Sequence, residues 1–551
     1  RGVLARAVAV LRAGGIAAVK GIGGYHLLCD ATSSDAVARL RARKRRPTKP
    51  LAVMFPHGRR DALDRVRAYV ELAPEEAEAL LSPARPIVLA RRLPSDIADE
   101  VASGLDELGV MLPYTPLHEL LLASFDAPLV ATSGNPSGEP LVTTAEDAER
   151  ELGDVADVFV HHDRPIVRPV DDAVVRRIAG RMRTVRIGRG LAPLEAKLPR
   201  PAPAPTLAVG GHMKNTVALA WGDRLVLSPH IGDLDGARSV DAFAATAEDL
   251  PALFRMTPEH LLADAHPDYA SARWAAGRGV PVSAIQHHAA HASAVAGEDP
   301  SVSRWLVFAW DGVGLGSDGT LWGGEGFVGR PGAWRRWSSF RPFRVPGATR
   351  SGREPWRSAA GMFWETHRQE PIAIPGARHL ARRAWEKGIN SPATSAVGRI
   401  FDAAAAILLG LERYGHEAEG PMRLEALAGG GDAVELPLAR DEHGVLRADW
   451  APLLETLVDD AQPVEARAGA LHASLVDAAV AQAEVARAEL DVHTIGLAGG
   501  VFQNRKLTES LVDALSQRDF DVRLNELIPM GDGGLAYGQV MEYLGSLHGD
   551  R

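Results

Sequence analysis

The sequence predicts an α/β protein in which a compact α/β domain is followed by a larger part with two sheet-bearing lobes. Near the N-terminus, short apolar stretches alternate with amphipathic ones, a pattern typical of strands that alternate with helices. A proline-rich run divides this region from the rest of the chain. Beyond that run, apolar stretches far apart in the sequence end in glycine pairs, which is typical of strands that lead into tight turns.

Length and composition limit the organisation of the chain and its partners. With 551 residues and 46% hydrophobic content, the chain is too long for one ordinary core, so two or three packed domains are expected. The formal net charge of -9 at pH 7 argues against nucleic acid as a partner, because phosphate affinity needs a cationic surface. No uncharged apolar run approaches the roughly 18 residues that cross a bilayer, and no signal peptide is evident. We therefore expect a cytoplasmic protein without a membrane partner.

Cysteine usage agrees with a reducing compartment. The chain has one cysteine, Cys29, which excludes an intrachain disulfide and a CxxC zinc site. Because Cys29 lies in an apolar stretch, we expect it to be a buried core residue.

The first domain is expected over residues 1–192. An amphipathic stretch predicts a helix over 34–45. Four apolar stretches predict short buried strands over 16–19, 86–90, 128–131 and 183–187.

A linker is expected over residues 193–206, and the second part over 207–551. The linker prediction rests on Pro199–Pro205, where prolines alternate with other residues. Such a run favours an extended conformation and excludes a helix.

Three apolar stretches of the second part run into glycine turns, over 207–211, 305–312 and 495–500. Such turns let backbone amides approach phosphate groups. One turn alone is a weak indication, because tight turns throughout α/β proteins use the same residues. Polar residues accompany all three turns, however, and the combination resembles the phosphate and adenosine motifs of actin, Hsp70 and sugar kinases. The expected nucleotide contacts are Gly210, Gly211, Lys214, Asn215, Gly499, Gly500 and Asn504.

A metal site is predicted from two histidines and two aspartates of the second part. His287 and His291 stand four residues apart and would share one face of a helix, which is metal-binding geometry. Residue types alone leave open the alternative that these histidines cap or pack the helix. Asp311 follows an apolar stretch, and Asp532 lies within Met530–Leu535. At both positions a buried carboxylate would need a cation. Two imidazoles with two carboxylates suit Zn²⁺ or Fe²⁺ better than Ca²⁺.

The first domain contains a candidate cradle for a triphosphate. Its core is the basic run that includes Lys44, Arg46 and Lys49, which suits phosphate binding. The alternative is that this run is only the solvated end of a helix stopped by Pro47. Charged and small polar side chains elsewhere in the domain extend the candidate site for an anion and magnesium: Lys20, Thr132, Ser133, Asn135, Arg168, Asp171, Arg186 and Arg189.

Motifs in both parts resemble those of the HypF family of hydrogenase-maturation carbamoyltransferases. In the first domain, the segments similar to the YrdC/Sua-type adenylate-forming domain are Lys20–His26, Lys44–Pro50, Ala131–Pro136 and Pro169–Asp172. In the second part, the segments similar to the Kae-type domain are Asn215–Ala218, Leu227–Leu234, His266–Tyr269, His287–His291, Arg353–Trp356, Asn390–Asp402 and Gly499–Asn504. The resemblance implies a YrdC/Sua-like α/β domain followed by a duplicated actin/Hsp70/sugar-kinase-like two-lobe domain.

The resemblance implies an ATP-dependent carbamoyltransferase. The first domain would use ATP, Mg²⁺ and carbamate or carbamoyl phosphate to form carbamoyl-adenylate, with Lys44 and Arg46 as catalytic residues. The labile adenylate would pass by an internal route to the second part. There, His287 and Asp311 would act with a divalent metal held by His287, His291, Asp311 and Asp532. The implied acceptor is the C-terminal cysteine of a HypE-type protein, and the product supplies the cyanide ligands of nickel–iron hydrogenase.

The sequence departs from the family pattern before the first domain and, more weakly, over Tyr414–Met422, and alternatives stay open. Acylphosphatase-like and zinc-finger domains precede the adenylating domain in the family, and without them carbamate release from carbamoyl phosphate is in doubt. The alternatives are a small-molecule O-carbamoyltransferase, a tRNA-modifying threonylcarbamoyl enzyme and a non-catalytic ATP-binding scaffold of the maturation complex. The choice between Glu417 and Glu419 as a nucleotide contact is also open.

Overall fold

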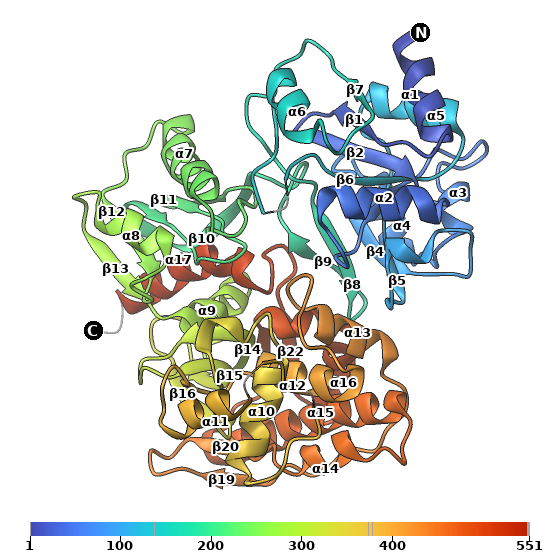
Figure 1. Cartoon of the computed structure of the whole chain (residues 1–551). Coiled ribbons are helices and arrows are strands. Elements are labelled where there is room, and N and C mark those ends of the chain that lie inside the picture. The colour runs from blue at the N-terminus through green and yellow to red at the C-terminus, as the bar shows by residue number, and fades with distance from the viewer. Residues whose placement is uncertain (1, 137, 373, 377, 548–551) are drawn as a thin grey trace. The chain divides into compact units, whose positions relative to one another are not determined.

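The computed structural model describes residues 2–136, 138–372, 374–376 and 378–547 (Figure 1). Its chain divides into two compact units. The first takes in the chain as far as Glu195, together with His212–Thr216 and Val226–Leu250. The second takes in Ala196–Gly211, Val217–Leu225 and the chain from Pro251 onward. Every helix among the described residues is too short or too polar to cross a lipid bilayer.

A nine-stranded mixed sheet forms the centre of the first unit, in the order β7-β1-β2-β6-β3-β5-β4-β8-β9. Successive residues of a strand point to opposite faces, so Ala18 packs in one hydrophobic cluster and Ala17 and Val19 in another. The sheet therefore has a core on each face. Its strands are β1 Ala17–Lys20, β2 Tyr25–Asp30, β3 Ala52–Met54, β4 Ile87–Arg91, β5 Glu107–Met111, β6 Leu129–Ser133, β7 Val158–Val160, β8 Val174–Ile178 and β9 Arg181–Arg186.

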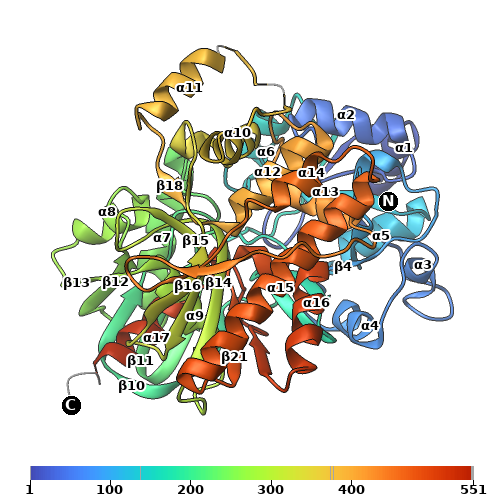
Figure 2. The ribbon, with the colours of Figure 1, turned by 90° about the horizontal axis from the view of Figure 1, so that it is seen from below.

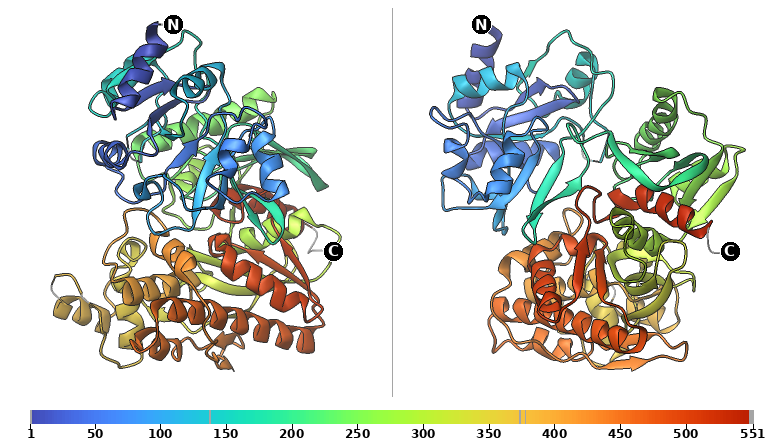
Figure 3. Two further views of the ribbon diagram at one scale, coloured as in Figure 1. Left: turned by 90° about the vertical axis from the view of Figure 1, so that its right-hand side faces the viewer. Right: turned by 180° about the vertical axis from the view of Figure 1, so that it is seen from behind.

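Helices cover both faces of this sheet (Figure 3). Buried residues of α2, α4 and α6 belong to one hydrophobic cluster, and those of α1 and α5 belong to the other. The helices of the first unit are α1 Gly2–Arg12, α2 Ser34–Lys44, α3 Asp64–Arg67, α4 Pro74–Leu81, η1 Asp99–Val101, α5 Pro116–Phe125, α6 Ala145–Leu152 and most of α7 Ala237–Leu253.

The predicted elements of the first domain are confirmed, with ends shifted by one or two residues. The predicted helix is α2, which begins after Ser33, whose side chain accepts a hydrogen bond from the Ala36 N–H. It ends because Arg45 has left-handed backbone angles, a usual way to end a helix. Cys29 is fully buried in the core, as predicted.

The predicted linker 193–206 is instead mostly part of strand β10, Leu194–Ala208. An extended conformation was expected there, and an extended strand accommodates the fixed φ angle of proline. The parallel pairing of β10 with β12 involves Thr206, Leu207 and Ala208. These residues follow Pro205, so the prolines, which have no N–H group, lie outside this ladder.

The smaller sheet, which lies largely in the second unit, has the order β11-β10-β12-β13. Helix α9 packs against α17, and Gly538 of α17 makes this contact close: a Cβ at this position would lie 2.0 Å from the Ala290 carbonyl oxygen. The remaining elements of this lobe are β11 Ala218–Leu227, β12 His260–Asp264, α8 Ala270–Ala276, β13 Val282–Ile285, α9 His287–Glu298 and α17 Leu535–Ser546.

The larger sheet of the second unit has the order β19-β20-β16-β15-β14-β21-β22. Its strands are β14 Trp305–Leu315, β15 Leu321–Gly329, β16 Arg335–Phe340, β17 Phe343–Arg344, β18 Ala393–Thr394, β19 Leu438–Arg440, β20 Leu446–Ala448, β21 Thr494–Ala498 and β22 Asp521–Leu524. Figure 2 shows α15 beside α16 next to this sheet. The helices are η2 Ala348–Arg350, α10 Trp356–Glu365, α11 Arg378–Glu386, α12 Val397–Leu409, α13 Glu419–Leu427, α14 Leu453–Val458, α15 Val464–Leu490, η3 Gly500–Gln503, α16 Arg505–Ser516 and η4 Asp532–Gly534. The prediction of two sheet-bearing lobes is confirmed.

Candidate active sites

Helix α9 positions two histidines of the second unit on one face. Gln286 caps the helix, and its side chain accepts a hydrogen bond from the Ala289 N–H. The helix therefore starts at His287, and His291 follows one turn later on the same face. Both side chains are 1% exposed, so each needs a polar partner or a ligand.

Two aspartates reach the same place from other elements. Asp311 lies on β14, which continues through a register shift between Trp310 and Gly314, where the sequence predicted a glycine turn. Such a β-bulge or irregularity changes the direction of side chains on the strand, and these features are common next to functional sites. Asp532 begins the short helix η4.

The four side chains form one compact cluster. Their potential ligand atoms all lie within 4.8 Å of one another. His291 Nε2 is 3.5 Å from Asp532 Oδ1 and 3.8 Å from Asp311 Oδ2, and His287 Nε2 is 3.6 Å from Asp311 Oδ2. Within the described residues, the Nε2 atoms of both histidines are buried without a hydrogen-bond partner. A divalent cation bound to all four groups would satisfy these nitrogens and neutralise the carboxylates, so the residues fit Zn²⁺ or Fe²⁺.

Asp264, at the end of β12, supports this cluster from behind. Its Oδ2 lies 2.7 Å from His287 Nδ1 and so accepts the Nδ1 hydrogen, which leaves Nε2 directed at the cluster. Burial opposes a charged imidazole, but Asp264 and the neighbouring aspartates outweigh it and raise the pKa of His287 well above its usual value. Burial likewise opposes a charged Asp311, but the two histidines lower its pKa well below the usual range. The aspartates therefore favour positive charge within this cluster.

One of the predicted glycine turns, at Gly499 and Gly500, lies beside this cluster. The parallel register pairs Ala309 of β14 with Ala498 of β21, so the residues after them are also neighbours. The Gly500 N–H donates to Asp311 Oδ1 at 3.2 Å. Gly499 has φ 99°, and a Cβ there would lie 2.2 Å from the Trp310 carbonyl oxygen, so only glycine fits.

The other predicted nucleotide contacts of the second part have different surroundings. Gly210 exchanges two hydrogen bonds with the Gln539 side chain, and the Gly211 carbonyl accepts one from Ser271. Asn504 caps α16 through Leu507 and also bonds His472. Its side chain is thus engaged within the fold.

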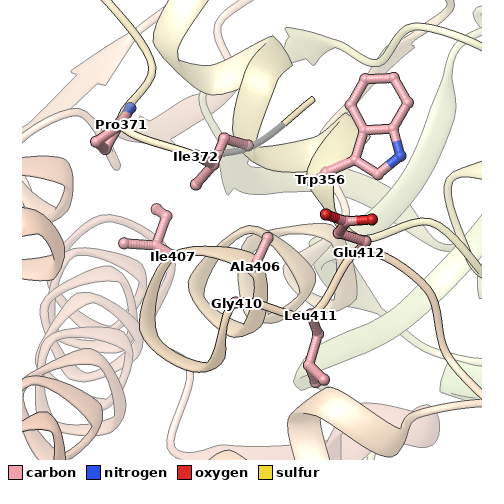
Figure 4. A pocket seen from close by; sticks show the side chains of 8 residues that line it. All are labelled: Trp356, Pro371, Ile372, Ala406, Ile407, Gly410, Leu411 and Glu412. Carbon is pink, nitrogen blue, oxygen red and sulfur yellow. The ribbon is translucent and has the colours of Figure 1, made fainter. Parts of the chain in front are cut away.

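Glu417 and Glu419 differ in exposure. Glu419 is buried and accepts the Gly415 N–H at 2.6 Å, whereas Glu417 is exposed. A pocket of about 140 Å³ lies elsewhere in the second unit (Figure 4), and it contains none of the predicted site residues. It is lined mainly by Trp356, Ile372, Ala406, Ile407 and Leu411, with Glu412 beside them.

In the first unit, the end of α2 brings Lys44 to the loop after β6. Lys44 Nζ donates to the carbonyl of Ser133 and, at 3.0 Å each, to the carbonyl and side-chain oxygens of Asn135. The Ser133 hydroxyl also donates to Asn135 Oδ1 at 2.7 Å. The structure therefore joins two motifs that are far apart in the sequence.

Further cations surround Lys44 with few carboxylates to balance them. Burial and, after it, the Arg46 charge lower the pKa of Lys44 to about 7. Burial and then Arg46 and Arg186 also lower the pKa of Lys49. Asp171 interacts with all these groups, and its carboxylate is 3.9 Å from Arg186. Such an excess of buried positive charge suits a polyanionic ligand.

Other predicted contacts of the first domain are engaged elsewhere. Arg168 pairs with Asp249, and both side chains are more than half exposed. Arg189 binds Asp172 at 3.0 Å and stacks over Tyr114. Lys20, which is buried, donates to the His162 carbonyl, and Thr132 is buried within β6.

Three protein-family models match the chain. The Sua5/YciO/YrdC model, described as telomere recombination, matches residues 9–188. The HypF Kae1-like domain matches 201–298. The second subdomain of the carbamoyltransferase Kae1-like domain matches 307–539.

Two curated relatives extend these matches over nearly the whole chain. The carbamoyltransferase HypF of Rhodobacter capsulatus is 41% identical over 553 residues, which cover 97% of this chain and 72% of the relative. The carbamoyltransferase HypF of Synechocystis sp. is 36% identical over 562 residues, with the same two coverages. The chain belongs to the HypF carbamoyltransferase family.

A solved HypF structure agrees in fold. The crystal structure of full-length HypF in the phosphate- and nucleotide-bound form has a TM-score of 0.95 and 33% identity, and the match covers 99% of this chain and 87% of that one. Membership in the HypF family makes this chain a carbamoyltransferase, and it confirms the predicted YrdC-like and Kae-like parts.

Sequence reasoning missed Asp264 as a partner of the histidine cluster. The only available signal was its place after an apolar stretch and just before the family segment His266–Tyr269. It also missed His230 and Asp233 of the HypF segment Leu227–Leu234, although that segment was quoted as a family motif. Both residues belong to the first unit, and both interact with its cationic cluster.

Proposed function

We propose that the first unit forms carbamoyl-adenylate from ATP and carbamate, and that the carbamoyl group is transferred at the histidine–aspartate cluster of the second unit. The acceptor proposed is the C-terminal cysteine of a HypE-type protein, in the maturation of nickel–iron hydrogenase. The observation that carries the proposal is the pairing, in one carbamoyltransferase chain, of a buried cationic cluster with a four-residue metal-ligand cluster.

Adenylate formation needs charge neutralisation and alignment rather than covalent help from the protein. A carbamate oxygen attacks the α-phosphorus of ATP, the bond to the β-phosphate oxygen breaks, and pyrophosphate leaves. Lys44, Arg46, Lys49 and Arg186 are the cations available to neutralise the polyphosphate. Asp171 lies among them and offers a carboxylate to Mg²⁺.

Transfer to the thiol consumes the mixed anhydride. The thiolate attacks the carbamoyl carbon, a C–S bond forms, the bond to the AMP phosphate oxygen breaks, and AMP leaves. A divalent metal held by His287, His291, Asp311 and Asp532 would supply Lewis acidity for the carbonyl or phosphate oxygen. Asp264 fixes the ring of His287 through Nδ1, and the turn at Gly500 holds Asp311.

The decisive experiment follows the carbamoyl group to its acceptor. The chain is incubated with ATP, carbamoyl phosphate and a HypE-type protein, and intact and peptide mass spectrometry then locates any thiocarbamate. We expect the modification on the C-terminal cysteine of the partner and none on a partner whose terminal cysteine is changed to serine. A parallel reaction with carbamate in place of carbamoyl phosphate separates failure to release carbamate from failure to transfer it.

Absence of thiocarbamate in both reactions, with a folded and metal-loaded chain, would refute the proposal. Pyrophosphate release separates the remaining explanations. Release without partner modification would point to a different acceptor, such as a small-molecule hydroxyl group. No release from ATP with either donor would leave a scaffold that binds ATP without using it.

A further inference from the structure

Two segments that follow the predicted linker 193–206 belong to the first unit. They are His212–Thr216 and Val226–Leu250, and the chain returns to the second unit between them and after them. Both lie beyond the segment that the Sua5/YciO/YrdC model matches, which ends at residue 188. The first unit therefore contains more than the adenylating domain that its sequence motifs define.

The two segments pair with each other by backbone hydrogen bonds. The Ile231 N–H donates to the Asn215 carbonyl at 2.8 Å, and the Asn215 N–H donates to the Gly232 carbonyl at 2.9 Å. The Lys214 N–H donates to Asp233 Oδ1 at 2.9 Å. These bonds fix Lys214 beside the loop Ser228–Asp233.

The same loop is attached to the end of β9. The His230 N–H donates to the Ile187 carbonyl at 2.8 Å, directly after Arg186, the last residue of that strand. The loop is therefore held next to Arg186, a cation of the candidate triphosphate site.

Side-chain charges connect the loop with the cationic cluster. His230 interacts electrostatically with Arg186, Asp171, Lys214 and Lys49. Lys49 in turn interacts with Asp233 as well as with Asp171. Lys214 therefore adds a cation to the cluster, and Asp233 adds a second carboxylate.

We propose that the polyphosphate site of the first unit is a composite site, which Lys214 and the loop Ser228–Asp233 complete. Lys214 would bind a phosphate group of a nucleoside triphosphate, and the His230 side chain would bind the carbamate that attacks it. This inference rests on the proposed adenylate-forming function. It moves Lys214 from the nucleotide site of the second part, where the sequence suggested it, to that of the first.

The state of His230 supports this division of roles. Burial and then the Arg186 charge lower its pKa to about 3, so the ring is neutral at physiological pH. A neutral imidazole offers one hydrogen-bond donor and one acceptor. Carbamate has both an oxygen acceptor and an amino donor, whereas fully ionised phosphates only accept, so the ring suits carbamate better.

The test uses the full chain and ATP–pyrophosphate exchange with carbamate as the second substrate. In Lys214→Ala we expect the KM for ATP to rise by about tenfold or more, because a charge-assisted contact is lost. In His230→Leu we expect the KM for carbamate to rise by a similar factor, with the KM for ATP changed less than about twofold. His230→Asn, which keeps a donor and an acceptor, should recover part of the loss.

Matched controls separate local effects from loss of folding. Lys197→Ala removes an exposed lysine of β10, and His443→Ala removes a histidine whose side chain is 77% exposed. Neither should change either KM. If His230→Leu fails to fold, Lys214→Ala and His230→Asn still decide the question, since neither places a large apolar side chain in the loop.

The inference and the proposed function fail in different ways. If Lys44→Ala abolishes exchange while Lys214→Ala and His230→Leu keep both KM values within about twofold of the unchanged chain, the composite site is wrong and adenylate formation stands. If the unchanged chain shows no exchange, the proposed function is wrong. Calorimetry with ATP then tests Lys214 on its own, and equal affinity in Lys214→Ala and the unchanged chain would overturn its role.

Discussion

The cationic cluster of the first unit and the histidine–aspartate cluster of the second differ in the charges that surround their buried basic side chains. Burial disfavours charge in both. In the first unit, neighbouring cations add to that effect, and the pKa of Lys44 is lowered to about 7. In the second unit, Asp311 and Asp532 overcome it and raise the pKa of His291. The charges of the neighbouring side chains, and not burial itself, therefore decide whether each site favours an anionic or a cationic ligand.

Loss of a histidine of the candidate metal site should have the largest effect, and it should affect only the second unit. We expect His291→Ala to lose bound divalent metal and to reduce carbamoyl transfer by roughly a thousandfold or more, because Lewis acidity stabilises the transition state by several kcal/mol. Elemental analysis and the thiocarbamate assay measure the two losses. ATP–pyrophosphate exchange should persist. Full metal stoichiometry in the variant would exclude His291 as a ligand.

Removal of a cation from the first unit should give the opposite pattern. We expect Arg46→Ala to lower ATP–pyrophosphate exchange by roughly a hundredfold or more, with metal content unchanged. Arg60→Ala, which removes an exposed arginine of the same domain, is the matched control. Unchanged exchange in Arg46→Ala would leave the triphosphate cradle without support.

Asp264→Asn should lower the metal affinity of the histidine–aspartate cluster without removing any metal ligand. The asparagine no longer supplies the carboxylate that holds His287 Nδ1, and loss of such a support typically costs roughly 10- to 100-fold in metal affinity. Competition with a chelator measures the change. Asp268→Asn, an exposed neighbour, should have no effect. Equal metal affinity in both variants would show that Asp264 contributes only to packing and not to metal binding.

The smallest expected effect is the pH dependence of ATP binding. A lysine with pKa about 7 is largely neutral above pH 7, so binding of a polyanion must first protonate it. ATP affinity should therefore fall as pH rises above 7, by at most about tenfold per pH unit. Calorimetry at pH 8 in buffers of different ionisation enthalpy should detect proton uptake. In Lys44→Arg, whose side chain stays charged, ATP affinity should depend less on pH. The same pH dependence in both proteins would contradict the assignment of this effect to Lys44.

Short-range patterns explain how much of the fold and of the site could be predicted. The four-residue spacing of His287 and His291 requires only a helix to bring both rings to one face, and the structure does bring them together with Asp311 and Asp532. The strands and helix of the first domain were likewise visible in local periodicity. Family motifs in both parts then identified the fold.

Long-range placement explains what was not predicted. Asp264 acts on His287 because β12 pairs in parallel with β13, the strand that leads into α9, and no local pattern encodes that pairing. Likewise, a sequence does not say which unit a loop will join, so Lys214 was grouped with Gly210 and Gly211 instead of the first unit. The strand β10 was missed because a run of prolines is more often a linker than part of a sheet.

The division of the chain has a consequence for biosynthesis. The chain passes between the two units after Glu195, Gly211, Thr216, Leu225 and Leu250. Domains usually fold in order as they leave the ribosome, but here the first unit lacks two of its segments until Leu250 has been synthesised. A nascent chain that has emerged only as far as Glu195 therefore still lacks the loop that holds His230, and its folding cannot be complete at that point.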